Sequence, residues 1–459
     1  MEPRRRDAHK DLLSPAGSGT GRAIVIGPYR RRPPRRPSPS QRPDNDRIPA
    51  ARLEEAIGLA RAIDLDVVEV GIVPIGEIRP ATYIGKGKVD EFAGLVKSLE
   101  AGIVVVDCAL SPVQQRNLEK AWAAKVLDRT GLILEIFGRR ARTKEGALQV
   151  ELAHLTYQRT RLVRSWTHLE RQRGGFGFLG GPGESQLEID RRLIEERIVR
   201  IEAELDKVKK RRKLHRDSRA RVPYPIAALV GYTNAGKSTL FNRLTKVSVV
   251  EADMLFATLD PTLRAVALPT GLKIIVSDTV GFISDLPTML VAAFRATLEE
   301  VIEANVILHV RDASHADTEA QSHDVEAVLQ ALGIETDKDE RLVEVWNKID
   351  RLDAGGRAAL ANLAERRPAG RRPVLVSALT GEGVDRLAAA IEALLSMSRV
   401  VLDLTLDPAD GAGVSWLYRH TEVMEKSLTA DNGLAMTVRV DPAQAATVQA
   451  KFGGGRKAV

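Results

Sequence analysis

A single cysteine, few aromatic residues and no long apolar run mark this chain of 459 residues. Cys108 has no second cysteine to pair with, so an intramolecular disulfide is excluded and a reducing compartment is favoured. No apolar stretch is long enough to span a bilayer, and the polar residues 1–10 are not followed by the apolar segment of a secretory signal. We therefore expect a cytoplasmic protein without stable membrane insertion; peripheral association with a membrane stays open.

The balance of residue types favours a folded protein with a polyanionic partner. Hydrophobic residues make up 44% and charged residues 28% of the chain, enough to bury several cores. The formal net charge is +7 and the isoelectric point about 9.4, which favours contact with a polyanion. A basic surface without such a partner would give the same numbers.

Strands and helices alternate in residues 22–141, after a polar tail at 1–21 that we expect to be disordered. Alternation of this kind predicts an α/β domain with a parallel sheet. Strands are expected at 22–27, 65–73, 103–107 and 131–137, and helices at 51–63, 89–99 and 113–124. Residues 29–46, dense in arginine and proline, cannot pack a core. We interpret them as a loop insertion that either is solvated or contacts RNA.

Two long helical patterns with a glycine-rich segment between them occupy residues 142–221. Apolar residues fall on one stripe of the first pattern: Leu148, Leu152, Leu155, Leu162 and Trp166. In the second pattern they recur in steps of four and three: Ile194, Ile198, Ile201, Leu205 and Val208. The segment 174–183, GGFGFLGGPG, cannot continue either helix. The pattern predicts an antiparallel helical hairpin with a glycine-rich tip. Its basic end, 207–221, is either a solvated helix face or a phosphate contact.

A second alternation of strands and helices covers residues 222–397, and residues 398–459 show a small α+β pattern. The expected fold is an α/β protein in four parts. They are an N-terminal α/β domain, the helical hairpin, a P-loop GTPase domain with a mostly parallel sheet and flanking helices, and a small C-terminal α+β domain.

The apolar strand pattern at 226–230 runs into a match to G-x-x-x-x-G-K-[ST], and a helix pattern follows. This order is what a P-loop requires, because backbone N–H groups and the helix N-terminus then face the phosphates of a nucleotide. Lys237 is expected to reach the β- and γ-phosphates, and the Ser238 hydroxyl to ligate magnesium. The loop residues are Gly231, Tyr232, Thr233, Asn234, Ala235, Gly236, Lys237 and Ser238.

A second motif, N-K-x-D, follows another strand pattern and selects the base. The Asp350 carboxylate can accept from guanine N1–H and the 2-amino group together, whereas adenine offers neither donor. Asn347 can bridge the base edge and the P-loop, and the Lys348 stem can cover one face of the ring. The predicted base contacts are Asn347, Lys348, Ile349 and Asp350, with Ser377, Ala378 and Leu379 offering a backbone N–H to guanine O6 after the next strand.

Two further segments are interpreted as switches that respond to the nucleotide. Asp278 can hold magnesium through water, and the Gly281 N–H can contact the γ-phosphate. Thr258 and Thr262 both suit a second magnesium hydroxyl, and we prefer Thr258. The predicted switch residues are Phe256, Ala257, Thr258, Leu259 and Asp260 in the first segment, and Asp278, Thr279, Val280 and Gly281 in the second. The predicted catalytic groups are Lys237, Thr258 and Gly281.

Phe282 follows Gly281, where many GTPases carry a glutamine that orients the attacking water. Because phenylalanine cannot hydrogen-bond, we expect slow intrinsic hydrolysis that depends on an external stimulus. Asn234 stands where some GTPases coordinate a monovalent cation beside the phosphates. Either potassium supplies positive charge there, or the asparagine only hydrogen-bonds the backbone.

The sequence resembles the HflX family of translation-associated GTPases over residues 22–400. The segments GYTNAGKST, LFATLDPT, DTVGF, NKID and SAL look like that family's nucleotide motifs. More specific are RPATYIGKGKVDE (79–91), DRTGLILEIFGRRARTKEGALQVELAHL (128–155) and GGPGESQLEIDRR (180–192). The resemblance implies a GTPase, stimulated by the ribosome, that binds the large ribosomal subunit and its RNA and splits or rescues stalled ribosomes. We expect a monomer that binds GTP and GDP.

The chain departs from the family pattern in two segments. The arginine- and proline-rich stretch at 29–43 is an insertion, and the tip lacks the arginine of a shorter loop, so tip contacts with RNA would run through its backbone, Phe176 and Phe178.

Two alternatives stay open. A GTP-switched signalling or membrane-associated regulator would share the nucleotide motifs, although no lipidation motif or hydrophobic anchor is present in the sequence. The residues 85–88, GKGK, either mark a second nucleotide site or form a basic turn or RNA contact.

Overall fold

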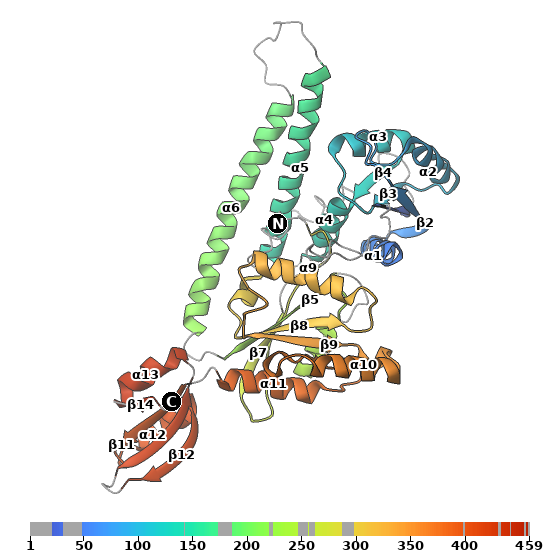
Figure 1. Ribbon diagram of the computed structural model, residues 1–459. Coiled ribbons are helices and arrows are strands. Elements are labelled where there is room, and N and C mark those ends of the chain that lie inside the picture. Colours follow the sequence, from blue (N-terminus) through green and yellow to red (C-terminus); the bar gives the residue numbers. More distant parts are fainter. Residues whose placement is uncertain are drawn as a thin grey trace.

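The computed structural model describes residues 21–30, 48–141, 143–172, 186–219, 224–246, 256, 262–286, 298–397, 400–429, 433–440, 442–453 and 456–457. Figure 1 shows four successive parts: an N-terminal α/β domain, a long helical hairpin that projects from the body, a P-loop domain, and a C-terminal domain at the far end from the N-terminal one. Residues 1–20 of the predicted tail, residues 31–46 of the arginine- and proline-rich stretch, and the glycine-rich tip at 174–183 lie outside the described residues.

The N-terminal sheet has parallel strands in the order β2-β1-β3-β4. The strands are β1 Arg22–Arg30, β2 Asp66–Ile75, β3 Ile103–Val106 and β4 Lys125–Asp128, and the helices between them are α1 Pro49–Arg61, α2 Lys86–Ser98 and α3 Pro112–Trp122. Buried residues of α2 and α3 pack on one face of the sheet, and those of α1 on the other. The predicted parallel α/β layer is confirmed, and residues 85–88 lie at the start of α2.

The prediction of a strand at residues 131–137 is wrong. These residues lie in helix α4 (Arg129–Arg140), and the fourth strand is β4, just before it. A short apolar run does not distinguish a strand from a helix that is buried on several sides. The Asp128 side chain caps this helix by accepting from the Gly131 N–H at 2.8 Å. The buried residues of α4 include Leu132, Ile133, Leu134, Ile136 and Phe137.

The predicted loop insertion at 29–46 begins too early, because Tyr29 and Arg30 belong to β1. Arg30 pairs with Ile75 at the end of β2. Tyr29 is 7% exposed, and its hydroxyl donates to Asp107 at 2.7 Å. Tyr29 therefore belongs to the core, although the residues that follow it in the sequence are rich in arginine. Its hydrogen-bond partner, Asp107, lies at the end of β3.

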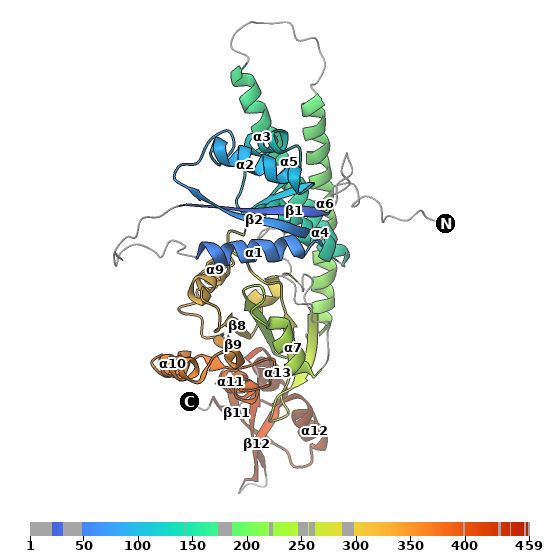
Figure 2. The ribbon, with the colours of Figure 1, turned by 90° about the vertical axis from the view of Figure 1, so that its right-hand side faces the viewer.

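Two long helices form the predicted antiparallel hairpin and run side by side in both views (Figures 1 and 2). They are α5 Lys144–Gln172 and α6 Gln186–Arg219. Leu148 of α5 packs with Ile201 and Leu205 of α6 in a small buried cluster, and Leu152 and Leu155 extend it. The base of the predicted apolar seam is therefore confirmed, whereas the side chain of Trp166 lies outside the described ones.

The P-loop domain has a sheet in the order β10-β9-β8-β5-β7-β6. Its strands are β5 Ile226–Gly231, β6 Thr262–Ala267, β7 Lys273–Asp278, β8 Val306–Asp312, β9 Leu342–Asn347 and β10 Val374–Leu375. Its helices are α7 Lys237–Thr245, α9 Thr318–Ala331, α10 Ala354–Glu365 and α11 Val384–Met397, with the 3-10 helices η2 Ile349–Arg351 and η3 Ala369–Arg371. β6 runs antiparallel to β7, and the other described pairs are parallel. The carboxyl ends of the parallel strands meet at one edge, where the nucleotide motifs lie.

The apolar cores of the N-terminal and P-loop domains are continuous. One cluster joins Leu59 of α1 and Phe137 of α4 to Val230 of β5 and Ile283 after β7. Figure 2 shows α1 between the N-terminal sheet and the P-loop domain. The N-terminal domain is therefore a packed neighbour of the P-loop.

The C-terminal domain is a small antiparallel sheet with helices on it, as predicted. The strand order is β12-β13-β11-β14. The elements are β11 Val400–Leu406, α12 Gly411–His420, β12 Glu422–Leu428, β13 Leu434–Val440, α13 Pro442–Phe452 and β14 Arg456–Lys457. Across all four parts, none of the described helices has the length and apolar character needed to cross a membrane.

Candidate functional site

The loop between β5 and α7 holds its backbone in conformations that few side chains adopt. Gly231 has a φ of 153° and Gly236 a φ of 90°, and Asn234 has a φ of 58°. A β-carbon at Gly231 would collide with the carbonyl oxygen of Val310, and one at Gly236 with the amide of Asn347. Glycine is therefore required at both positions, and the resulting curl is the one that cradles phosphates.

Lys237 lies inside this curl and is 6% exposed. Its Nζ donates to the carbonyl oxygens of Gly231 at 3.2 Å and Tyr232 at 2.8 Å. Burial lowers the pKa of Lys237 to about 8, against an opposing contribution from Asp278. Phosphate oxygens beside Nζ would favour the charged form again, so the position suits a polyanion.

Ser238 and Asp278 bring two oxygen ligands together. The Ser238 hydroxyl, at the start of α7, donates to the Asp278 carboxylate at the end of β7 over 2.7 Å. A hydroxyl and a carboxylate are hard oxygen donors that suit magnesium. Both residues therefore fit the predicted metal role.

The first predicted switch segment is described at Phe256. Thr258 lies outside the described residues, as do its neighbours Ala257, Leu259 and Asp260. Phe256 is 2% exposed, and its ring meets that of Phe137 edge to face with centroids 4.7 Å apart. Thr262, the alternative to Thr258, begins β6 and pairs with Asp278 across the sheet.

The second switch segment pairs with the P-loop through its backbone. The Thr279 hydroxyl donates to a carbonyl oxygen of β5 at 2.6 Å, and Val280 is buried. The Thr233 N–H donates to the Phe282 carbonyl at 2.7 Å, and the Phe282 N–H donates to the Gly231 carbonyl at 3.1 Å. The Phe282 ring is 1% exposed within the apolar core, so it cannot orient a water at the phosphate site.

Asn347 joins the separate parts of the base site. Its amide nitrogen donates to the Ala235 carbonyl at 2.8 Å, and its amide oxygen accepts from the Ala378 N–H at 2.9 Å. Asp350 accepts from the Ser377 hydroxyl at 2.6 Å. These hydrogen bonds bring the P-loop, the N-K-x-D motif and the Ser-Ala loop together at one edge of the sheet.

Two residues that hold the base site were not predicted. Asp312, at the end of β8, forms an ion pair with Lys348 at 2.8 Å. Arg243 of α7 donates to a carbonyl oxygen of the Ser-Ala loop at 3.1 Å. A polar residue at the carboxyl end of a parallel strand was the available signal for Asp312; the sequence carries none for Arg243. Of the neighbouring predicted residues, Ile349 is buried and Leu379 is 68% exposed.

A cavity of about 640 Å³ opens beside the P-loop, between the N-terminal and P-loop domains. The P-loop, the base motif and helix α1 all contribute to its wall. Its lining includes Thr233, Asn234, Asp312 and Lys348 from the P-loop domain, and Glu54, Glu55, Gly58 and Arg61 from α1. The wall supplied by α1 has no signal in the sequence, because it depends on how two domains pack.

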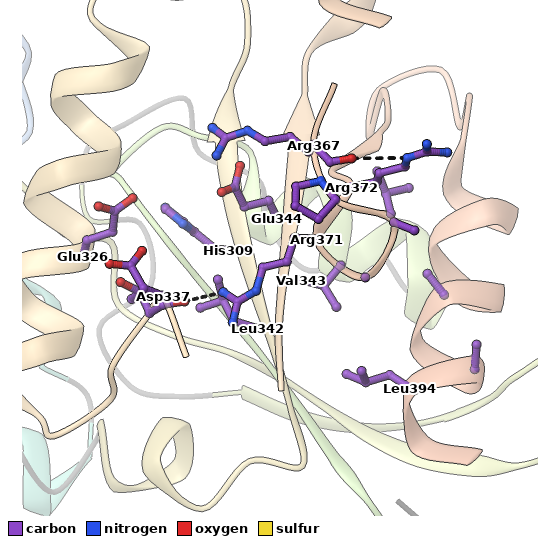
Figure 3. Close-up of a pocket in the computed structure, with 17 residues that line it drawn as sticks. His309, Glu326, Asp337, Leu342, Val343, Glu344, Arg367, Arg371, Arg372 and Leu394 are labelled. Atoms are coloured by element: carbon purple, nitrogen blue, oxygen red, sulfur yellow. Dashed lines mark hydrogen bonds between the residues drawn. The ribbon is translucent and has the colours of Figure 1, made fainter. Parts of the chain in front are cut away.

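A second cavity of about 640 Å³ lies beside α9 and η3 (Figure 3). His309 of β8 lines it, and burial lowers the pKa of His309 to about 3, so the ring is neutral at physiological pH. Arg371 donates to the Thr336 carbonyl at 2.7 Å across this cavity wall. None of the described residues predicted to bind nucleotide lines this space, whereas Tyr232, Thr233, Asn234 and Lys348 line the first cavity.

Comparison with known proteins finds family models along most of the chain. Residues 50–138 match "GTP-binding GTPase N-terminal", 140–219 "GTP-binding GTPase Middle Region", 226–348 "50S ribosome-binding GTPase" and 362–459 "HflX C-terminal domain". The chain is 49% identical to the GTPase HflX of Magnetococcus marinus, over 81% of this chain and 84% of that protein. It is 47% identical to the GTPase HflX of Escherichia coli, over 79% and 83%.

Among solved structures, a GTP-binding protein of Sulfolobus solfataricus in complex with GDP aligns over 81% of this chain and 98% of that chain. The TM-score is 0.43 and the sequence identity 22%.

Proposed function

The chain belongs to the HflX family of GTPases, and from this premise we propose that it binds the large ribosomal subunit and uses GTP to split or rescue stalled ribosomes. The observation that carries the nucleotide part is the bridge made by Asn347, which ties the P-loop to the Ser-Ala loop beside Asp350. The ribosomal part is supported by the match of residues 226–348 to a ribosome-binding GTPase model and by the net charge of +7.

The residues of the site account for hydrolysis of GTP to GDP and phosphate. Water attacks the γ-phosphorus in line, the bond to the β–γ bridging oxygen breaks, and negative charge develops on the leaving GDP. Lys237 stabilises that charge from within the curl, and the Gly281 N–H holds a γ-phosphate oxygen. Magnesium would be held by the hydroxyls of Ser238 and Thr258 and, through water, by Asp278, and it would add positive charge beside the phosphates.

The stimulus for hydrolysis comes from outside the site in this proposal. The buried ring of Phe282 leaves the attacking water without a side chain from that position. We propose that the ribosome supplies the missing orientation, so that intrinsic turnover is slow and turnover with large subunits is fast.

Cosedimentation with ribosomal subunits tests the proposal. Protein loaded with a non-hydrolysable GTP analogue should pellet with large subunits, and GTP-loaded protein should lower the light scattering of intact ribosomes. Binding should weaken steeply with salt, because phosphate contacts release counterions. Cosedimentation with membrane vesicles and not with subunits would favour the alternative, a GTP-switched signalling or membrane-associated regulator.

We also propose that potassium assists hydrolysis at Asn234, which lines the cavity beside the phosphate curl. Phe282 stands where many GTPases have a glutamine, and a monovalent cation at Asn234 would add positive charge beside the phosphates. GTPase rates should be at least ~10-fold higher in potassium than in sodium, and Asn234→Ala should remove that difference. Equal rates in the two salts, with and without ribosomes, would overturn the potassium proposal.

A further inference from the structure

Arg129, at the start of α4 in the N-terminal domain, reaches into the P-loop domain. The residue is 3% exposed. Its guanidinium forms ion pairs with Asp107 and Glu55, both at 2.5 Å. It also donates to the Ser284 hydroxyl at 2.7 Å and to the Ser284 carbonyl at 3.1 Å. Ser284 follows Gly281 by three residues, so a buried charge of one domain holds the chain directly after the second switch segment of the other.

Glu55 connects the same cluster to the P-loop itself. One carboxylate oxygen accepts from the Tyr232 hydroxyl and the other from the Ser284 hydroxyl at 3.1 Å. The Tyr232 hydroxyl in turn accepts from the Ser284 N–H at 2.8 Å. Glu55, Tyr232 and Ser284 therefore form a closed triangle of hydrogen bonds.

The cluster is charged as well as buried. Burial alone would lower the pKa of Arg129, but the carboxylates of Asp107 and Glu55 outweigh it and raise the pKa, so the guanidinium stays protonated. Tyr29 donates to Asp107 at 2.7 Å and satisfies a further carboxylate oxygen. Removing one partner from such a cluster leaves a buried charge uncompensated, so its members hold one another in position.

The chain held in this way, residues 281–284, includes Gly281, whose N–H would contact a γ-phosphate. A β-carbon at Gly281 would stand 3.0 Å from Lys237 Nζ and 2.9 Å from the Thr233 side chain, so the Gly281 backbone lies directly against the P-loop. Backbone hydrogen bonds from Phe282 fix one end of the segment there. Ser284, through Glu55 and Arg129, fixes the other end.

Helix α4 also contacts the first switch segment. Phe137, on the same helix as Arg129, packs edge to face on Phe256 with an interplanar angle of 74°. One helix of the N-terminal domain therefore contacts both segments that respond to the nucleotide.

We propose that Glu55 and Arg129 are positioning residues for the GTP site, which hold Gly281 where its N–H meets the γ-phosphate. This inference rests on the proposed GTP binding. Because GDP lacks the γ-phosphate, the cluster strengthens the binding of GTP and leaves that of GDP nearly unchanged. The coupling is reciprocal, so bound GTP tightens the packing of the N-terminal domain on the P-loop domain.

The test compares Glu55→Gln with Glu91→Gln in the full-length chain. Glu91, on helix α2 of the same domain, is exposed and pairs with Lys88 at 2.6 Å, and it lines neither of the two cavities described above. Affinities for GDP and for a non-hydrolysable GTP analogue are measured with each variant. Glu55→Gln should lose about tenfold in affinity for the analogue while its affinity for GDP changes by less than about twofold. Glu91→Gln should match the wild-type chain for both nucleotides.

Ser284→Ala provides a second variant if Glu55→Gln does not fold, because it removes only a buried hydroxyl from the cluster. It should show the same selective loss for the analogue. An unchanged ratio of the two affinities, or an equal loss for both nucleotides, would overturn the positioning role. A wild-type chain that binds neither nucleotide would instead overturn the proposed function.

Discussion

Lys237 is a buried lysine whose charge and whose ligand depend on each other. Burial lowers its pKa to about 8. A bound triphosphate places negative oxygens near Nζ and raises that pKa, so binding takes up a proton when the pH exceeds about 8. The contribution of Lys237 to affinity is therefore fully present below pH 8 and is lost progressively as the pH rises above it.

The resulting prediction concerns the affinity for GTP between pH 7 and pH 9. Affinity should be flat up to about pH 8 and then fall by up to about tenfold per pH unit. Lys237→Arg is the control, because arginine stays protonated throughout this range. It should bind more weakly, since the guanidinium does not fit the curl, but without this pH dependence. The same slope in both proteins, measured by equilibrium titration, would show that another group is responsible.

At the scale of elements, the parts of the site with local requirements could be predicted from the sequence. The glycines at 231 and 236 are needed because their own backbone angles and close neighbours exclude a β-carbon. The strand before them and the helix after them follow from a continuous apolar run and a helical period. Asn347 and Asp350 were found for the same reason, since a short motif at a strand end carries the chemistry.

Secondary structure and burial that depend on contacts with distant parts of the chain could not be predicted in this way. Apart from Glu135, residues 132–137 are apolar and buried, because α4 packs among its own sheet, α1, α5 and the P-loop domain. The short apolar run therefore does not mark the segment as a helix. Glu55 and Arg129 look like ordinary surface charges on helical patterns. Their burial depends on a contact with Ser284, more than a hundred residues away, and such a contact leaves no trace in a single sequence.

At the scale of the whole molecule, the P-loop domain, the N-terminal domain and the hairpin are joined by contacts. The P-loop domain binds the nucleotide, and the N-terminal domain shares its core and contacts both switch segments. The hairpin formed by α5 and α6 projects from this body. A change at the γ-phosphate can therefore reach the N-terminal domain through buried contacts, and we propose that this domain and the hairpin carry the change to the ribosome.

The central claim is that guanine nucleotide in this one site drives the splitting of ribosomes. Asp350→Asn tests it, because the amide donates where guanine also donates, whereas the 2-oxo group of xanthine accepts. The variant should lose up to ~10⁴-fold in preference for GTP over xanthosine triphosphate. Asp353→Asn is the matched control: Asp353 caps α10 by accepting from the Gly356 N–H at 2.7 Å, and asparagine caps equally well.

The most direct measurement is the light scattering of intact ribosomes mixed with each protein and each triphosphate. Wild-type chain and Asp353→Asn should split ribosomes with GTP and not with xanthosine triphosphate, and Asp350→Asn should split them with xanthosine triphosphate and not with GTP. Splitting by Asp350→Asn that still follows GTP, or that proceeds equally with either triphosphate, would contradict the account.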